Sequence, residues 1–268
     1  IALYGQYYVS ENKSYVNELI QTLDKFKVTY CVEKQFFEGM SNDFNLPDIT
    51  TFSSYHDLDN SFDFMFTIGG DGTILRAVTF VRDLNIPLVG INTGRLGFLA
   101  TIQKEEIAQA VERIFQNKFH IYERSLLSVS TVPEMKGLNS LNIALNEVSV
   151  SRRDTPSMIT VKTYLDDEYL TSYWADGLII ATPTGSTGYS LSCGGPIITP
   201  SAKSFALTPI APHNLNARPL VVPDDTEITL EVKGREDSFF LSLDSRITTV
   251  SNNTTVKVKK ADYKLKMA

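Results

Sequence analysis

The sequence contains few cysteines and no long apolar run. Cys31 and Cys193 are its two cysteines, too few for a disulfide framework or a cysteine-based metal cluster. No apolar stretch approaches the roughly 18 residues that indicate a membrane span. No charged and apolar leader precedes the opening strand pattern IALYG, so we do not expect secretion. These absences predict a reducing, cytoplasmic location without membrane association.

Basic stretches are also lacking. The formal net charge is −6, and no run of Lys and Arg interrupts that acidic background. We therefore expect no nucleic-acid partner, because such partners require a basic surface. Hydrophobic residues make up 43% and charged residues 21% of the 268 positions, the mixture of an ordinary globular protein of one or two domains. A phosphate-bearing ligand would need local positive charge or a metal ion.

The first part of the chain alternates between two patterns. Short apolar or β-branched runs, among them residues 64–68 and 86–92, read as strands. Between such runs, apolar residues recur at helical spacing over residues 16–26 and 107–115. This alternation predicts an α/β domain with a mostly parallel sheet over residues 1–122.

The pattern changes after residue 122. Most segments up to residue 250 alternate between apolar and polar residues or are rich in β-branched residues, with turn residues between several of them. We expect a β-rich, sandwich-like domain over residues 123–250, with a short helix somewhere in 189–212. The lysine-rich alternation in residues 251–268 suggests an edge strand, where lysine discourages unwanted pairing.

The string GGDGT, residues 69–73, follows one of the buried strands and precedes a helix. Glycines let a ligand approach the backbone, and the free amides that open the helix suit a phosphate. Asp71 would repel phosphate, so it points to metal binding or to proton abstraction from an attacking hydroxyl. The alternative is a tight turn in which Asp71 only accepts local amides. Neither the P-loop nor the Rossmann glycine pattern fits this string.

Three further clusters carry possible ligand-binding groups. NTGRLGFLA, residues 92–100, follows the next strand and offers Arg95 to phosphate. NEVSVSRRD, residues 146–154, opens with an amide and a carboxylate that can hydrogen-bond a base or a ribose. WADGLIIATPTGSTGYSLSCGGP, residues 174–196, combines hydroxyls and amides with an aromatic ring for stacking. Each cluster also has a purely structural interpretation. The first could be an ordinary loop, the second a solvated hairpin end and the third a linker.

Together these four clusters resemble the NAD kinase family in order and approximate spacing, over nearly the whole chain. GGDGT alone is shared with diacylglycerol-type lipid kinases and loosely with phosphofructokinases, whereas the last cluster is more specific. The resemblance implies transfer of the γ-phosphate of ATP to the 2′-hydroxyl of the adenosine ribose of NAD, with Mg²⁺ accompanying ATP. A lipid kinase and a non-catalytic dinucleotide-binding module remain the alternatives. These motifs do not distinguish NAD from NADH as the substrate, or ATP from polyphosphate as the phosphate donor.

The resemblance also implies roles for individual residues. Asp71 is the expected proton acceptor, and the C-terminal segment is expected to pack back on the first domain. No protein ligand to a metal is predicted. The residues expected to bind NAD or ATP are Gly72, Arg76, Asn146, Glu147, Asp176, Thr187, Gly188, Tyr189, Ser190, Leu191, Ser192 and Ala211.

Two residues depart from the family pattern. Trp174 stands where many relatives have Arg or Lys, and Arg246 stands where relatives often have glutamine. Family members usually form homodimers or homotetramers that share a dinucleotide site. The Pro-rich, apolar segment 209–223, which carries His213 and Arg218, is either a subunit contact or an internal connection.

Overall fold

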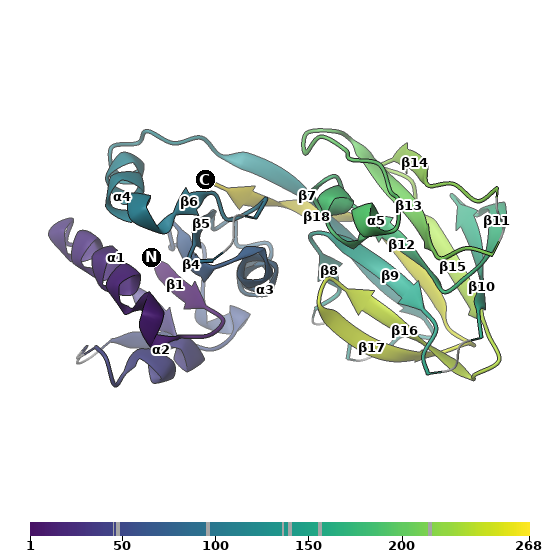
Figure 1. Ribbon diagram of the computed structural model, residues 1–268, viewed down its shortest axis with the longest axis horizontal. Coiled ribbons are helices and arrows are strands. Elements are labelled where there is room, and N and C mark those ends of the chain that lie inside the picture. The colour runs from purple at the N-terminus through teal and green to yellow at the C-terminus, as the bar shows by residue number, and fades with distance from the viewer. Residues whose placement is uncertain are drawn as a thin grey trace. The chain divides into compact units, whose positions relative to one another are not determined.

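The structure is a computed structural model that describes residues 1–44, 46, 49–94, 97–135, 137–138, 141–154, 157–213 and 216–268 (Figure 1). It divides into two compact units. Unit 1 comprises Ile1–Glu123 with Leu265–Ala268, and unit 2 comprises Arg124–Lys264. The chain thus passes from one unit to the other twice. The C-terminal segment 251–268 is divided between them, with residues 251–264 in unit 2 and residues 265–268 in unit 1.

Unit 1 has a parallel sheet with helices around it. Its elements are β1 (Ala2–Gly5), η1 (Ser10–Asn12), α1 (Lys13–Lys25), β2 (Cys31–Glu33), α2 (Lys34–Met40), β3 (Thr50–Phe52), η2 (Tyr55–Asp57), β4 (Met65–Gly69), α3 (Asp71–Val81), β5 (Leu88–Asn92), β6 (Ile102–Gln103), η3 (Lys104–Glu106) and α4 (Ile107–Phe115). The strand order is β5-β4-β1-β2-β3, and every pair is parallel. This confirms the parallel α/β arrangement that the alternating pattern predicted.

Alternation along the strands divides the side chains between the two faces of this sheet. Leu3, Phe66 and Val89 share one core cluster with apolar residues of α1, α2 and α4. The helix α3 packs against β1, β4 and β5 and buries its own apolar stripe, Ile74, Ala77, Val78 and Val81. Both faces of the strands are therefore covered, as continuous apolar runs require.

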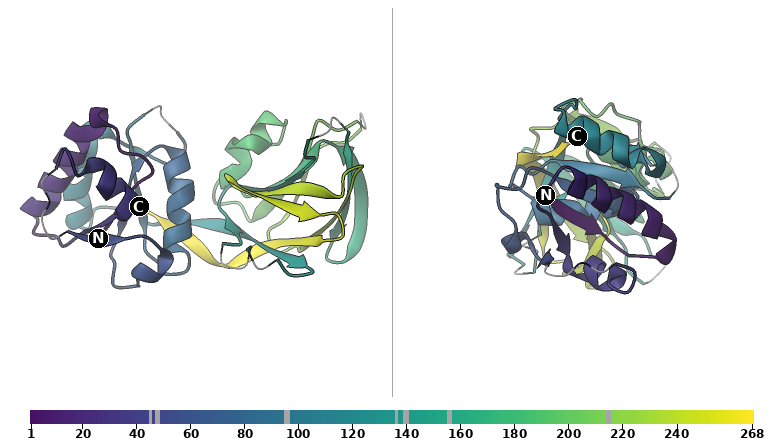
Figure 2. Two further views of the ribbon diagram at one scale, coloured as in Figure 1. Left: turned by 90° about the horizontal axis from the view of Figure 1, so that it is seen from below. Right: turned by 90° about the vertical axis from the view of Figure 1, so that its left-hand side faces the viewer.

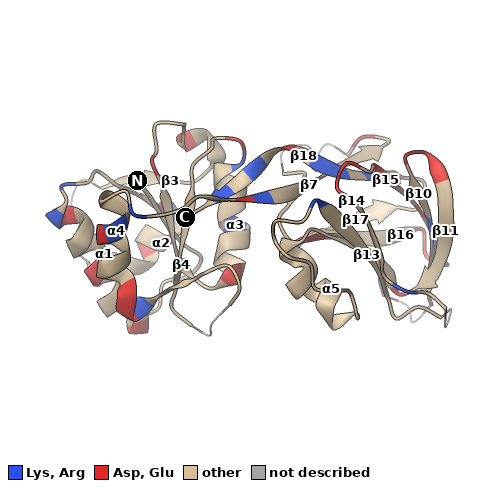
Figure 3. Ribbon diagram, turned by 90° about the horizontal axis from the view of Figure 1, so that it is seen from above, with Lys and Arg blue, Asp and Glu red and all other residues tan. Residues whose placement is uncertain are grey.

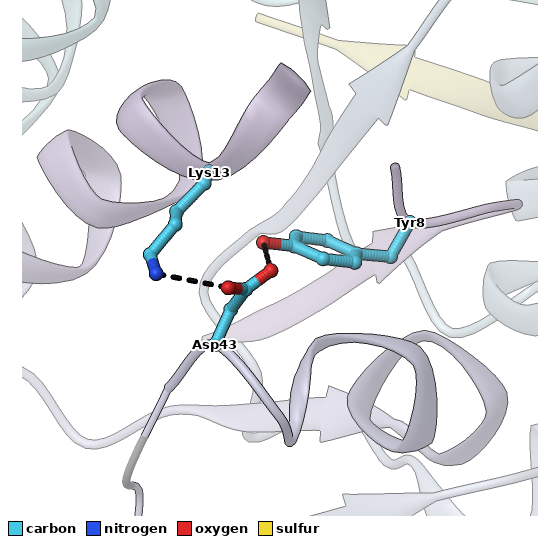
Figure 4. A network of polar contacts seen from close by, with 3 residues as sticks. All are labelled: Tyr8, Lys13 and Asp43. Atoms are coloured by element: carbon cyan, nitrogen blue, oxygen red, sulfur yellow. Dashed lines mark hydrogen bonds and ion pairs between the residues drawn. The ribbon is translucent and has the colours of Figure 1, made fainter. Parts of the chain in front are cut away.

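The connection after β1 is fastened by a small polar network (Figure 4). The Tyr8 hydroxyl donates to Asp43 Oδ2 at 2.7 Å, and Lys13 Nζ donates to Asp43 Oδ1 at 2.9 Å. These two hydrogen bonds, the Lys13 bond most of all, lower the pKa of the Asp43 carboxyl. The network ties the segment after α2 to the start of α1.

Unit 2 consists almost wholly of strands. Its elements are β7 (Tyr122–Val132), which begins in unit 1, β8 (Ile143–Ala144), β9 (Glu147–Ser151), β10 (Ile159–Leu165), β11 (Glu168–Ala175), β12 (Gly177–Ala181), η4 (Thr184–Thr187), α5 (Tyr189–Ser192), β13 (Ser204–Ile210), β14 (Leu220–Pro223), β15 (Ile228–Lys233), β16 (Ser238–Leu243), β17 (Arg246–Ser251) and β18 (Thr255–Met267), which ends in unit 1. The short helix expected within residues 189–212 is α5, but β13 fills most of the remainder.

Two antiparallel arrangements face one another in unit 2 (Figure 2). One sheet has the order β14-β13-β12-β9-β16-β17, and the other includes β11-β10-β15-β18. Alternate residues of both sheets, such as Val150, Leu178, Val161 and Leu230, join one apolar cluster. The β-rich, sandwich-like domain expected from the sequence is therefore present, with its core between the sheets.

The prediction that the lysine-rich segment forms an edge strand is wrong. In unit 2, β18 pairs with β15 through residues Thr255–Val258, and β7 also pairs with β18. Val256 and Val258 are fully buried. Figure 3 marks the basic positions along β18, of which Lys257 pairs with Glu227 at 2.7 Å and Lys260 with Asp224 at 3.0 Å.

Candidate functional site

The GGDGT turn joins β4 to α3. Gly69 has φ 153°, and a Cβ there would lie 2.1 Å from Thr73 Oγ1, so the junction requires glycine at this position. Gly70 is the extended residue before the helix, and Asp71 is its first residue. Apart from the chain neighbours and the backbone of α3 itself, no atom of the described residues lies within 4 Å of the Cβ position of Gly70 or Gly72, so these residues leave the backbone open to a ligand there.

The Asp71 carboxylate is held by three consecutive backbone amides. Oδ2 accepts the Phe98 N–H at 2.8 Å, whereas Oδ1 accepts the N–H groups of Leu99 at 3.0 Å and Ala100 at 3.1 Å. The structure thus brings residues 98–100 of the NTGRLGFLA segment to the GGDGT turn. Arg95, which we expected to meet phosphate, lies outside the described residues.

Arg76 lies one helical turn after Asp71 and is exposed. Its charge acts on Tyr4, at the end of β1. Burial raises the pKa of the Tyr4 hydroxyl to about 12, and the Arg76 guanidinium opposes that rise. Arg76 therefore places a positive charge near the end of β1, the strand beside β4.

Asn146 and Glu147 stand at the start of β9 in unit 2. Asp244, in the turn between β16 and β17, accepts the backbone N–H groups of Leu145 at 2.9 Å, Asn146 at 2.8 Å and Glu147 at 3.1 Å. Asp244 has φ 51°, a conformation that Asp tolerates better than most residues. The pair's backbone is thus fixed by a carboxylate that sequence reasoning did not identify as part of the site.

Arg246 completes the same turn. Its Nη1 donates to the Leu141 carbonyl at 2.6 Å, and its Nη2 donates to the Ile143 carbonyl. The departure from the family pattern noted in the sequence therefore supports the backbone of the segment that precedes Asn146. We call the turn residues Asp244 and Arg246, with these contacts, the β16–β17 clamp.

Burial perturbs both carboxyl groups at this end of β9. It raises the pKa of Glu147 to about 7, and the nearby Asp244 charge adds to the rise. Burial also raises the pKa of Asp244, against the opposing effects of its three amide bonds and of Arg246. Glu147 Oε2 and Asn146 Oδ1 are buried without a hydrogen-bond partner among the described residues. Both oxygens are therefore suited to accept donors from a ligand.

The GSTGY segment packs directly against this pair. The Asn146 carbonyl accepts the Thr182 N–H at 2.9 Å, just before η4. A Cβ at Gly188 would lie 3.1 Å from Glu147 Oε2. The structure therefore brings Asn146 and Glu147 together with the loop that the sequence singled out as nucleotide-binding.

Residues in and before α5 differ in accessibility. Tyr189 is 48% exposed, and Leu191 and Ser192 are exposed as well. Ser190 is fully buried and shares a 2.9 Å hydrogen bond with Thr208, so its side chain supports the fold. The Thr187 hydroxyl donates to the Thr184 carbonyl at 3.3 Å. Tyr189 is the residue of this group best placed to offer a ring face to a ligand.

Asp176 and Ala211 lie close to one another at the other end of β12. Asp176 Oδ1 accepts Arg152 Nε at 2.8 Å, an ion pair that sequence reasoning missed. The Asp176 N–H donates to the carbonyl of Ile210, the residue before Ala211. Ala211 itself has φ 45°. Trp174, half-exposed on β11, lies with its ring 4.4 Å from that of His213.

Two kinds of feature are absent from the described part of the chain. No group of three His, Cys, Asp or Glu side chains there is placed to hold a metal ion. No helix within the described ranges has the length and apolar character needed to cross a bilayer.

Family models match both halves of the chain. Residues 2–119 match the ATP-NAD kinase N-terminal domain, and residues 145–268 match the ATP-NAD kinase C-terminal domain. The matched ranges contain Asp71 and the Asn146–Glu147 pair respectively.

Whole-chain relatives carry the same name. The chain is 54% identical to a NAD kinase of Flavobacterium johnsoniae over 268 residues, covering all of this chain and 91% of that protein. It is 47% identical to a NAD kinase of Cytophaga hutchinsonii and 41% identical to one of Bacteroides fragilis, in each case covering 99% of this chain and 91% of the relative.

Solved structures with the same fold include two complexes. The yeast NADH kinase complexed with NADH superposes with a TM-score of 0.89 at 25% identity, covering 99% of this chain and 82% of that one. An Archaeoglobus fulgidus NAD kinase in complex with ATP superposes with a TM-score of 0.78 at 26% identity, covering 100% of this chain and 93% of that one.

Proposed function

The chain belongs to the NAD kinase family, and we propose that it transfers the γ-phosphate of ATP to the 2′-hydroxyl of the adenosine ribose of NAD. The products are NADP and ADP. Family models for NAD kinase match both halves of the chain, which disfavours a lipid kinase. The observation that carries the proposal is Asp71, a carboxylate held in fixed orientation at the first residue of α3 beside open glycine backbone.

Asp71 supplies the proton acceptor in this proposal. A ribose hydroxyl is a poor nucleophile near neutral pH, and a carboxylate within hydrogen-bond reach can take its proton as the phosphoryl group arrives. The N-terminus of α3 and the glycines beside Asp71 suit the ATP phosphates, and the charge of Arg76 adds to this preference. Positioning and charge compensation then supply most of the rate enhancement.

NAD recognition is assigned to unit 2. Glu147 Oε2 and Asn146 Oδ1 can accept hydrogen bonds from ribose hydroxyls or from the adenine amino group. Tyr189 offers an exposed ring next to this pair for stacking. The yeast relative is named an NADH kinase and was solved with NADH, so both redox forms of the dinucleotide are candidate substrates.

Mg²⁺ enters the proposal as part of the MgATP substrate. Mg²⁺ is commonly held by one or two carboxylates together with substrate phosphates, and keeps several waters. When bound, it would neutralise charge that develops on the transferred phosphoryl group.

A cytoplasmic homo-oligomer is the remaining part of the proposal. The edge strands β11 and β14 expose the apolar side chains of Tyr169, Trp174 and Val221. A pocket of about 350 Å³ lies beside them, lined by residues 170–174, Pro212 and residues 216–220. Exposed apolar edge strands favour pairing with a second chain.

The test is a coupled assay for NADP formation from NAD and MgATP with Asp71→Asn. We expect turnover to fall by about 10²–10⁴-fold, because general-base catalysis is typically worth that much. Affinity for NAD should stay close to the wild-type value in calorimetry. Asp262→Asn, at an exposed position on β18, is the matched control and should retain full activity. Near wild-type turnover of a clean Asp71→Asn preparation would remove Asp71 from the chemistry.

A further inference from the structure

We infer that Gly97 and the amides of Phe98, Leu99 and Ala100 form a cradle that positions the Asp71 carboxylate and assigns proton acceptance to its Oδ2 atom. The inference rests on the role proposed above for Asp71. In these terms Gly97 is a positioning residue, because it acts through Asp71 and carries no reacting group itself.

The cradle has little spare room. A Cβ at Gly97 would lie 2.2 Å from Asp71 Oδ1, 2.5 Å from Cγ and 2.6 Å from Oδ2. All three distances are far shorter than van der Waals contact, so any side chain at position 97 displaces the carboxylate. Glycine is required at this position because the Asp71 carboxylate fills the space that a Cβ would occupy.

The three amides distinguish the two carboxylate oxygens. An ionised carboxylate offers about four lone-pair positions, two on each oxygen. Oδ1 accepts both Leu99 and Ala100, whereas Oδ2 accepts Phe98 alone. Among the described contacts, only Oδ2 therefore retains an open lone pair for a substrate hydroxyl.

The chemical step follows from that assignment. The 2′-hydroxyl O–H bond breaks, and its proton moves to Asp71 Oδ2. The ribose oxygen forms a bond to the γ-phosphorus while the bond from the γ-phosphorus to the β–γ bridging oxygen breaks. That bond's electron pair leaves with ADP, and the Oδ2 proton is later released to solvent. The amides on Oδ1 and Oδ2 hold the open lone pair in a fixed direction throughout.

The first experiment compares Gly97→Ala with Gly94→Ala, which lies in the same loop and whose Cβ position has no atom within 4 Å from the described residues beyond its chain neighbours. Gly97→Ala should lower kcat on the order of 10²-fold, because misplacing a reacting group by about 1 Å has that effect. NAD affinity by calorimetry should change less than about twofold, since the Asn146–Glu147 pair is untouched. Gly94→Ala should behave as wild type.

A double-mutant cycle tests whether Gly97 acts through Asp71. In the Asp71→Asn background, Gly97→Ala should lower the residual kcat little further, because the carboxylate function is already lost. Fully multiplicative losses would show that Gly97 acts independently and would overturn the inference. Unchanged kcat for a folded Gly97→Ala enzyme would overturn it too. If wild-type protein fails to form NADP at all, the proposed function fails instead.

Hydrogen exchange followed by NMR tests the cradle without relying on Gly97→Ala. Asp71→Ala removes the shared acceptor, so the amides of Phe98, Leu99 and Ala100 should exchange with solvent faster than in wild type. The Gly94 amide, which donates to Asn92 Oδ1 at 2.9 Å, is the internal control and should not change. Unaltered exchange at all three cradle amides would contradict the geometry.

Discussion

At the residue scale, two aspartates each collect three consecutive backbone amides. Asp71 collects those of residues 98–100 in unit 1, and Asp244 collects those of residues 145–147 in unit 2. The two side chains are both partly exposed but differ in position, since Asp244 lies in the turn between β16 and β17 whereas Asp71 opens the helix α3. The same bonding pattern thus serves a group proposed to react in one case and a purely supporting group in the other.

Glu147 links folding stability to pH. Its pKa is raised from an ordinary value near 4.5 to about 7, so the folded state holds this proton more tightly than the unfolded state. The stabilising effect of the bound proton is therefore complete below about pH 4.5 and is lost as the pH rises to about 7. Over that interval the loss of unfolding free energy is at most on the order of 3 kcal/mol.

Glu147→Gln should remove that loss. In urea denaturation, the ligand-free variant should be more stable than wild type at pH 8, with the difference shrinking toward pH 4.5. NAD affinity should fall at pH 8, because a charged acceptor is replaced by a neutral amide. Glu168→Gln, at an exposed position on β11, is the control. A difference in stability that does not vary with pH would argue against the buried-carboxyl explanation.

The sequence predicts the candidate site residues but not the residues that hold them in place. Asp71, Asn146 and Glu147 stand out because of their local strings, GGDGT and NEVSV. Their partners do not: the Asp71 cradle is 27 to 29 positions away and Asp244 is 97 to 99 positions from the amides it accepts. These hydrogen bonds form only where two distant loops contact one another in the folded protein. Backbone amides are the same for every residue type except proline, so the local sequence does not predict which of them will be bonded.

At the element scale, the β16–β17 clamp holds the segment that carries the proposed dinucleotide contacts. The Arg246 guanidinium donates to two carbonyls. Asp244, two residues before Arg246, accepts hydrogen bonds from three backbone N–H groups. Loss of one partner leaves buried backbone groups unpaired, at about 1–3 kcal/mol for each group.

Arg246→Leu should therefore weaken both stability and NAD binding. We expect the melting temperature to fall and the Kd for NAD to rise, with kcat at saturating NAD affected least. Arg246→Gln is the matched variant: its amide nitrogen has two hydrogens, enough for the carbonyls of Leu141 and Ile143. It should recover much of the affinity. Equal losses for both substitutions would mean that the positive charge, rather than the two hydrogen bonds, is what matters.

Element prediction succeeded where the pattern was strong. The alternating strands and helices of unit 1 and most strands of unit 2 follow their apolar periodicity. The lysines of β18 led to the wrong prediction of an edge strand. Polar residues at every second position indicate a strand with one solvated face, and both interior and edge strands can have such a face. Their acidic partners, Glu227 and Asp224, come from the chain near β15 and could not be inferred locally.

At the scale of the whole molecule, the proposed assembly depends on the β11 edge. Trp174→Asp should shift the protein toward monomer in light scattering at working concentration, because a charge would replace a half-exposed apolar ring. Ile247→Asp, at an exposed apolar position on the other sheet's edge strand β17, is the control and should leave the mass unchanged. A wild-type protein that is fully active as a monomer would end the oligomer proposal.

The two crossings between units also govern when each unit can fold during synthesis. Met267 pairs with Leu88, and the Ala268 N–H donates to the Leu88 carbonyl at 3.0 Å, so the Leu88 end of β5 lacks its neighbour on the side away from β4 until the end of β18 has emerged from the ribosome. At about 5–20 residues per second, that wait after Leu88 is translated lasts roughly 10–35 s. Unit 2, whose residues are continuous in sequence, completes its translation first. The nascent chain thus holds an unfinished sheet edge beside β5 while unit 2 is still being made, and chaperone demand should concentrate there.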